Sequence, residues 1–172
     1  MKALLGLFGL FGISCAVLSA QPKNAKSFKL TVSVFPDRGL IPRHFTCDGE
    51  NVSPPMTWSG EPQGTQSFVL MVDDRDAPMG FVHWLLWDIP ASVHSLAEGV
   101  NAMGISGTNG FGKRGYGGPC PPSGSHLYAF QLFAIDVPSL NLATGAKRPD
   151  LDRALRKHVL AKVEYDGVYG HN

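Results

Sequence analysis

Alternation of apolar and polar residues is the first regular pattern along this chain. From Phe28 to Val34 an apolar side chain occupies every second position, which is typical of a strand with one buried face. Three denser apolar runs follow and are typical of central strands covered on both faces. They are Ser67 to Val72, Phe81 to Ile89 and Leu127 to Ile135. The pattern predicts a chain built mainly from β-strands.

One segment near the C-terminus has helical spacing instead. Pro149, Asp150 and Asp152 suit a helix start, because acidic side chains interact favourably with the positive N-terminal end of a helix. The apolar residues that then fall on one helical face are Leu151, Ala154, Leu155 and Val159. We predict a mainly β fold: an antiparallel Greek-key β-sandwich with one or two short helices, the main one near the C-terminus.

The composition agrees with a folded, turn-rich domain. The chain has 172 residues, of which 44% are hydrophobic and 17% charged, values that fit one ordinary globular domain. Its 20 glycines and 13 prolines indicate many turns. A net charge of +1 argues against binding nucleic acid, which needs a basic surface. It is compatible with one small anion in one pocket.

Residues 1–20 have the composition of a secretory signal. Lys2 gives the charged start, Ala3 to Leu18 the apolar region, and Ser19 with Ala20 a small-residue exit. We predict cleavage after Ala20, which leaves residues 21–172 as a single domain that is periplasmic or secreted, with no stable membrane span. A membrane anchor is one alternative, although three glycines interrupt the short apolar run. Lipid attachment through Cys15 is another.

Two cysteines remain after such a cleavage, Cys47 and Cys120. Disulfides persist in the compartments that exported proteins reach, and both cysteines lie in loops rich in proline and glycine. Neither has the Cys-x-x-Cys spacing of a metal or redox site. We therefore predict that they form a structural disulfide.

Two polar segments adjoin the apolar runs. Residues 74–78, Asp-Arg-Asp-Ala-Pro, precede His83, which lies within an apolar run. Residues 117–122, Gly-Gly-Pro-Cys-Pro-Pro, precede His126 at the start of another. Burying a polar group without a partner costs roughly 1–3 kcal/mol. Two strand histidines in such surroundings therefore indicate a binding site.

Strand geometry suggests which side chains share that site. Alternate residues of a strand face the same side, so His126 should project with Tyr128, and His83 with Phe81, Leu85 and Trp87. Imidazole N–H and phenol O–H groups can donate hydrogen bonds to phosphate oxygens. A nearby aspartate would orient a histidine or bind a cationic part of the ligand. The other histidines lack such surroundings and are expected at the surface; they are His44, His94, His158 and His171.

Four short motifs in this order resemble the phosphatidylethanolamine-binding protein family, also called the Raf kinase inhibitor protein family. They are Asp-x-Asp-Ala-Pro at 74–78, a histidine a few residues on, Gly-x-Pro-x-Pro at 117–121 and Gly-x-His-x-Tyr at 124–128. The stretches at 47–55, Cys-Asp-Gly-x-Asn-x-Ser-Pro-Pro, and at 118–122, Gly-Pro-Cys-Pro-Pro, are similar to the bacterial and archaeal branch. The resemblance runs from about Phe28 to Tyr169. It implies a β-sandwich core with helices near the C-terminus.

The resemblance also implies a small cavity for phosphate or phosphoethanolamine-like groups. The positions that would bind the ligand are Asp74, Pro78, His83, Pro121, Pro122, His126 and Tyr128. Those that would shape the site are Asp76, Gly117, Gly118 and Pro119. The family's usual arginine after the second histidine is Leu127 here, which removes any ion pair that this arginine would make with an acid of the first motif.

We therefore expect an exported, non-enzymatic protein that binds a small phosphorylated or other anionic ligand and needs no metal or cofactor. The resemblance also implies a protein partner, such as a protease, a kinase or a signalling protein that it inhibits or modulates. The alternative is a phosphoester hydrolase in which Asp74, His83 and His126 hold a metal or act as acid and base. No Gly-x-Ser-x-Gly nucleophile motif is present.

Overall fold

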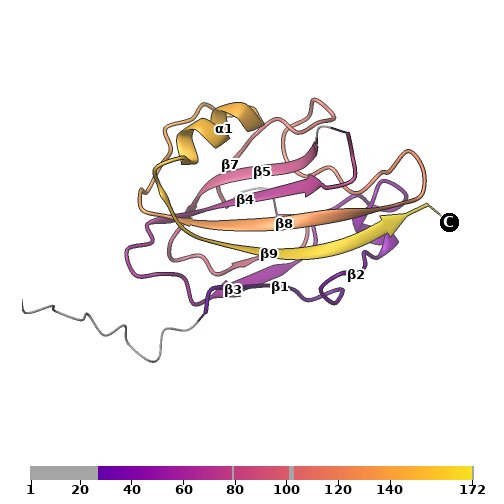
Figure 1. Cartoon of the computed structure of the whole chain (residues 1–172), viewed down its shortest axis with the longest axis horizontal. Helices are drawn as coiled ribbons and strands as arrows, with labels where there is room; N and C mark the ends of the chain where they lie inside the picture. Colours follow the sequence, from indigo (N-terminus) through magenta and orange to yellow (C-terminus); the bar gives the residue numbers. More distant parts are fainter. Residues whose placement is uncertain (1–26, 79, 101–102, 172) are drawn as a thin grey trace, which may run out of the picture.

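The structure is a computed structural model that describes residues 27–78, 80–100 and 103–171. The predicted signal at 1–20, with Cys15, lies outside these residues. In the described part, nine strands form two sheets accompanied by one α-helix (Figure 1). The elements are β1 (Lys29–Val32), β2 (Gly39–Leu40), a 3-10 helix (Arg43–Phe45), β3 (Met56–Ser59), β4 (Ser67–Asp74), β5 (Phe81–Pro90), β6 (Ser95–Leu96), β7 (Ile105–Ser106), β8 (Ser125–Ile135), α1 (Arg148–Leu155) and β9 (Val159–Gly170). No helix among them is both long and apolar enough to cross a membrane.

The sheets differ in size and in strand direction. The small sheet has the order β1-β3-β6 and the large sheet the order β2-β9-β8-β4-β5-β7. β2 runs parallel to β9, with Gly39 opposite Gly167, so the prediction of an antiparallel fold is wrong at this edge. The two strands are far apart in sequence, and no hairpin therefore forces them to be antiparallel. The Greek-key connectivity stays a prediction.

The predicted central strands are covered on both faces. In β4, Leu70 and Val72 pack into the hydrophobic core between the two sheets. Val69 and Met71, on the other face of the strand, pack with buried side chains of α1. α1 accordingly lies on the side of the large sheet away from β1 and β3 (Figure 1). Burial on both sides explains why β4, β5 and β8 have dense apolar sequences instead of alternating ones.

The helix is shorter than the sequence suggested. Leu151 and Leu155 are the buried residues of α1. Val159, predicted to lie on the same helical face, is instead the first residue of β9 and is 42% exposed. The pairing of β9 with β8, which sets Val159 opposite Ile135, offers this segment a long ladder of hydrogen bonds. Tertiary pairing therefore overrides the helical spacing at this position.

Candidate functional site

Asp74, the last residue of β4, holds both the turn that follows it and a histidine. Its Oδ1 atom accepts the backbone N–H groups of Asp76, at 2.9 Å, and of Ala77, at 3.0 Å, which is the geometry of an Asx turn. Its Oδ2 atom accepts a hydrogen bond from Nδ1 of His126 at 2.7 Å. The Asp74 carboxylate therefore stabilises the turn after β4 and also holds His126 in place.

His126 lies at the start of β8, beside the turn that follows β4. The backbone N–H of Arg75 donates to the carbonyl of Leu127 at 2.8 Å, and the backbone N–H of Leu127 donates to Oδ2 of Asp76 at 2.7 Å. Asp76 thus holds the first residues of β8 beside this turn, and Leu127 contacts Asp76 through its backbone N–H. Because Asp74 accepts from Nδ1, Nε2 is the ring nitrogen of His126 that remains available to a ligand.

His83 occupies a β-bulge in β5. Val72 and Asp73 are consecutive in β4, yet they pair with Trp84 and Val82, so His83 is the extra residue of the longer strand. A bulge of this kind re-aims the side chain and reverses the alternation beyond it.

Because of the bulge, the predicted orientation of His83 is wrong. We expected it to share a face with Leu85 and Trp87, but these two pack toward α1. The ring of His83 instead lies 5.1 Å from that of Tyr128, which belongs to the core between the sheets. His83 therefore reaches the same side of the large sheet as His126 and Tyr128.

The polar contacts of His83 determine its tautomer. Nδ1 donates to the carbonyl of Gly117 at 2.7 Å, and the backbone N–H of Gly117 donates to the carbonyl of His83 at 2.9 Å. Since a carbonyl can only accept, Nδ1 carries the proton and Nε2 has the free lone pair. Burial lowers the pKa of His83, and the hydrogen bond to Gly117 and the charge of Asp74 oppose this shift. The ring is therefore neutral at pH 7 before any ligand binds.

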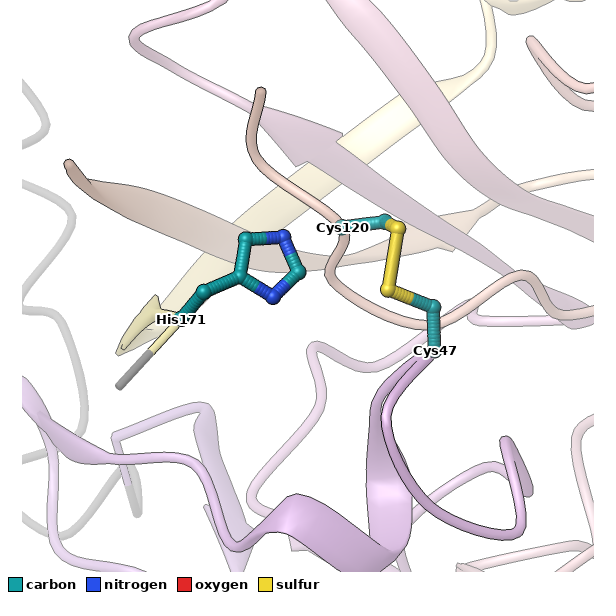
Figure 2. A group of neighbouring side chains, drawn as sticks. All are labelled: Cys47, Cys120 and His171. Carbon is teal, nitrogen blue, oxygen red and sulfur yellow. A yellow bond between two sulfur atoms is a disulfide. The ribbon is translucent and has the colours of Figure 1, made fainter. Parts of the chain in front are cut away.

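The Gly-Gly-Pro segment is attached to the loop around residue 47. The backbone N–H of Gly118 donates to Oδ1 of Asn51 at 2.6 Å, and the carbonyl of Pro119 accepts the N–H of Cys47 at 3.1 Å. A side chain at Gly118 would collide with neighbouring backbone, so glycine is needed there. The predicted disulfide is confirmed: Cys47 and Cys120 are joined, with their Cα atoms 5.5 Å apart (Figure 2).

These groups surround a cavity of about 300 Å³. The residues that line it are Asp74, Ala77, Pro78, Phe81, His83, Phe111, Cys120, Pro122 and His126. Five of the seven predicted ligand-binding residues are among them. Pro121 and Tyr128 are buried and are not among the lining residues; Tyr128 lies two positions further along β8 than His126. Burial raises the pKa of Tyr128, so its hydroxyl keeps its proton.

Phe111 is a lining residue that the sequence pattern did not reveal. Its ring centroid lies 5.4 Å from that of His83 and 4.8 Å from that of Phe81. The buried Asn109 folds the glycine-rich loop by accepting, at Oδ1, the backbone N–H groups of Phe111 and Lys113. Because Phe111 lies in a loop, no hydrophobic periodicity marks it as a site residue. A single aromatic residue within a glycine-rich segment is the one local feature that could have indicated it.

The cavity does not have the geometry of the metal centre considered from the sequence. Within the described ranges, a group of three such residues whose ligand atoms all lie within 4.8 Å of one another is formed by Cys47, Cys120 and His171. Asp74 and His126 are in contact, but His83 does not join them in such a group. The two-histidine, one-carboxylate arrangement is therefore not formed by these side chains.

Comparison with known proteins identifies the relatives of this chain. A family model described as phosphatidylethanolamine-binding protein matches residues 19–170. A UPF0098 protein of Aquifex aeolicus is 45% identical over 98% of each chain. One from Methanothermobacter thermautotrophicus is 43% identical over 81% of this chain and 97% of its own.

Two crystal structures share the fold. One is a phosphatidylethanolamine-binding protein homolog from Chlamydia trachomatis, with 33% identity, a TM-score of 0.81, and coverage of 85% of this chain and 99% of its own. The other is E. coli YbcL, described as a member of the mammalian family, with 30% identity, a TM-score of 0.79, and coverage of 84% and 99%. Because the family model spans most of the chain and close relatives share its fold, this chain belongs to the phosphatidylethanolamine-binding protein family.

Proposed function

We propose that this chain is an exported, non-enzymatic binding protein that holds a small phosphate- or phosphoethanolamine-like anion in the cavity beside Asp74, His83 and His126. The observation that carries the proposal is the shared arrangement of the two imidazoles. Each is held at Nδ1, by the Gly117 carbonyl or by Asp74, and each lines the cavity. A protonated ring can then donate its Nε2–H to an anion, and such charge-assisted hydrogen bonds are strong.

The remaining surroundings favour an anion despite the nearby carboxylate. Both oxygens of Asp74 already accept hydrogen bonds, three in all, so this carboxylate is stabilised by N–H groups of the protein itself. Phe81, Phe111 and two prolines form apolar walls, and exclusion of water strengthens electrostatic interactions inside a site. A volume of about 300 Å³ is at the small end of ligand pockets, which suits a headgroup-sized ligand.

The other parts of the proposal rest on chemistry and on the family. The hydrolase alternative has no support, since the curated relatives are named only as UPF0098 proteins. A disulfide is typical of oxidising compartments, which supports export to the periplasm or beyond. Inhibition or modulation of a protease, kinase or signalling partner stays a prediction from the family.

We expect His83→Ala and His126→Ala each to weaken binding of inorganic phosphate and of O-phosphoethanolamine by about 1.5–3 kcal/mol, the value of a hydrogen bond to a charged group. Isothermal titration calorimetry measures both ligands, and a preference for O-phosphoethanolamine would identify a headgroup rather than free phosphate. His158→Ala is the matched control, because His158 also contacts a carboxylate, at 2.8 Å, but lies just before the start of β9, away from the cavity. Unchanged affinity in both site variants would contradict the assignment.

Binding should also depend on pH. Because the pKa of His83 is lowered in the free protein and an anion raises it, the complex binds more protons than the free protein does. Affinity for sulfate, whose charge is constant in this range, should therefore rise as pH falls from about 8 to about 6, by up to about tenfold per unit for each proton taken up. His83→Ala should flatten the profile. An affinity independent of pH in the wild type would exclude His83 as the group that takes up the proton.

A further inference from the structure

His171, expected to be an ordinary surface residue, lies beside the disulfide. A ring nitrogen of His171 and the Sγ atoms of Cys47 and Cys120 all lie within 4.8 Å of one another. Figure 2 shows the imidazole ring facing the bond, with one ring nitrogen toward Cys120. Cys47 lies in the loop after the 3-10 helix, Cys120 in the segment before β8, and His171 directly after the end of β9.

A carboxylate orients this ring. Oδ2 of Asp48 accepts a hydrogen bond from Nδ1 of His171 at 2.7 Å and another from the hydroxyl of Tyr169 at 2.5 Å. Since the carboxylate accepts at Nδ1, the lone pair of His171 is on Nε2. Histidines that bind metals almost always donate their other ring N–H to such a partner, which fixes the tautomer and the ring orientation.

We propose that reduction of the Cys47–Cys120 disulfide creates a zinc site made of the two cysteine sulfurs and Nε2 of His171, with Asp48 as the orienting carboxylate. A dithiol reductant transfers two electrons and two protons to the disulfide, which gives two thiols and a disulfide in the reductant. Zn²⁺ then displaces the two thiol protons, and the resulting site of two thiolates and one neutral imidazole has no net charge.

The dimensions and the ligand types suit this ion. Zn–S bonds of about 2.3 Å and Zn–N bonds of about 2.0 Å place neighbouring ligands of a tetrahedral ion roughly 3.6 Å apart. The three ligand atoms are already confined within 4.8 Å, so small side-chain movements suffice. Thiolate and imidazole ligands favour zinc over magnesium or calcium. His171 is exposed, which leaves the fourth position to water.

The site shares no histidine with the anion cavity, so the two proposals can fail separately. Cys120 does line that cavity, and zinc would replace the disulfide as the link between the two loops.

The test uses the full chain without a histidine tag, with Cys15→Ser so that Cys47 and Cys120 are the only thiols. After reduction with a phosphine and anaerobic desalting, Zn²⁺ is titrated against a chromophoric chelator. The reduced protein should bind one Zn²⁺ per chain and the oxidised protein none. His171→Ala should weaken binding by at least about tenfold, whereas the control His158→Ala should bind like the parent. Co²⁺ should give the visible spectrum of four-coordinate cobalt with thiolate ligands.

Thermal unfolding covers the case in which reduction alone unfolds the chain. Zn²⁺ should raise the melting temperature of the reduced parent, or restore its cooperative transition, and should do neither for His171→Ala. Absence of zinc binding by the reduced parent would overturn the proposal. Equal affinity of the parent and His171→Ala would also overturn it, because the cysteines alone would then account for binding.

Discussion

Reducing the Cys47–Cys120 disulfide in the presence of a metal chelator is expected to lower the free energy of unfolding by about 4 kcal/mol. The bond joins residues that are 73 positions apart, and the chain-entropy model assigns roughly this stabilisation to a closed loop of that length. Urea unfolding of the Cys15→Ser protein, oxidised and reduced, measures the difference. The chelator keeps zinc from replacing the covalent link.

The control for this experiment is oxidised Cys15→Ser, which should unfold like the oxidised wild type because the Cys47–Cys120 bond is intact in both. A loss below about 1 kcal/mol on reduction would contradict the expectation. Cys120 lines the cavity that we propose to bind an anion, so reduction should also weaken phosphate binding at urea concentrations where the sheets are still folded. If phosphate affinity does not change, the bond stabilises the fold without shaping the cavity.

Arg148→Ala should destabilise the protein by about 3 kcal/mol. Asp73 is 7% exposed, and its Oδ2 atom accepts hydrogen bonds from Nη1 of Arg148 at 2.6 Å and from Nε2 of Gln131 at 2.7 Å. Removing the arginine leaves a buried carboxylate without its cation, which costs roughly 3–5 kcal/mol when both groups are fully buried. Arg148 is one-third exposed, so the lower end of that range applies.

Arg153→Ala is the matched control, because it removes the same side chain from the same helix. Arg153 is exposed and approaches Asp150 only at 3.5 Å, and a surface pair contributes about 1 kcal/mol or less. Adding Asp73→Asn to Arg148→Ala should recover part of the loss, since the buried charge is then absent. Equal destabilisation by the two arginine variants in urea unfolding would refute the role of the buried pair.

Much of the site could be predicted from the order of strands, turns and polar residues along the sequence. Asp74 ends a buried strand and precedes a turn, and an aspartate in that position accepts the turn's own N–H groups; both properties are local. His126 follows a proline- and glycine-rich loop at the start of a strand, which is also local. Phe111 could not be found in this way, because its place against His83 depends on how Asn109 folds the loop.

The sequence by itself determined the β-rich composition of the fold, the central strands and the positions of the two histidines, because alternation and turn residues act over a few positions. Only the tertiary structure decided the side on which His83 lies, since the bulge exists through the register of β5 against β4. The cluster of Cys47, Cys120 and His171 likewise could not be predicted from sequence spacing, because its three segments meet only after the sheets have packed. Contacts of this kind depend on pairing across the whole chain, which no local pattern specifies.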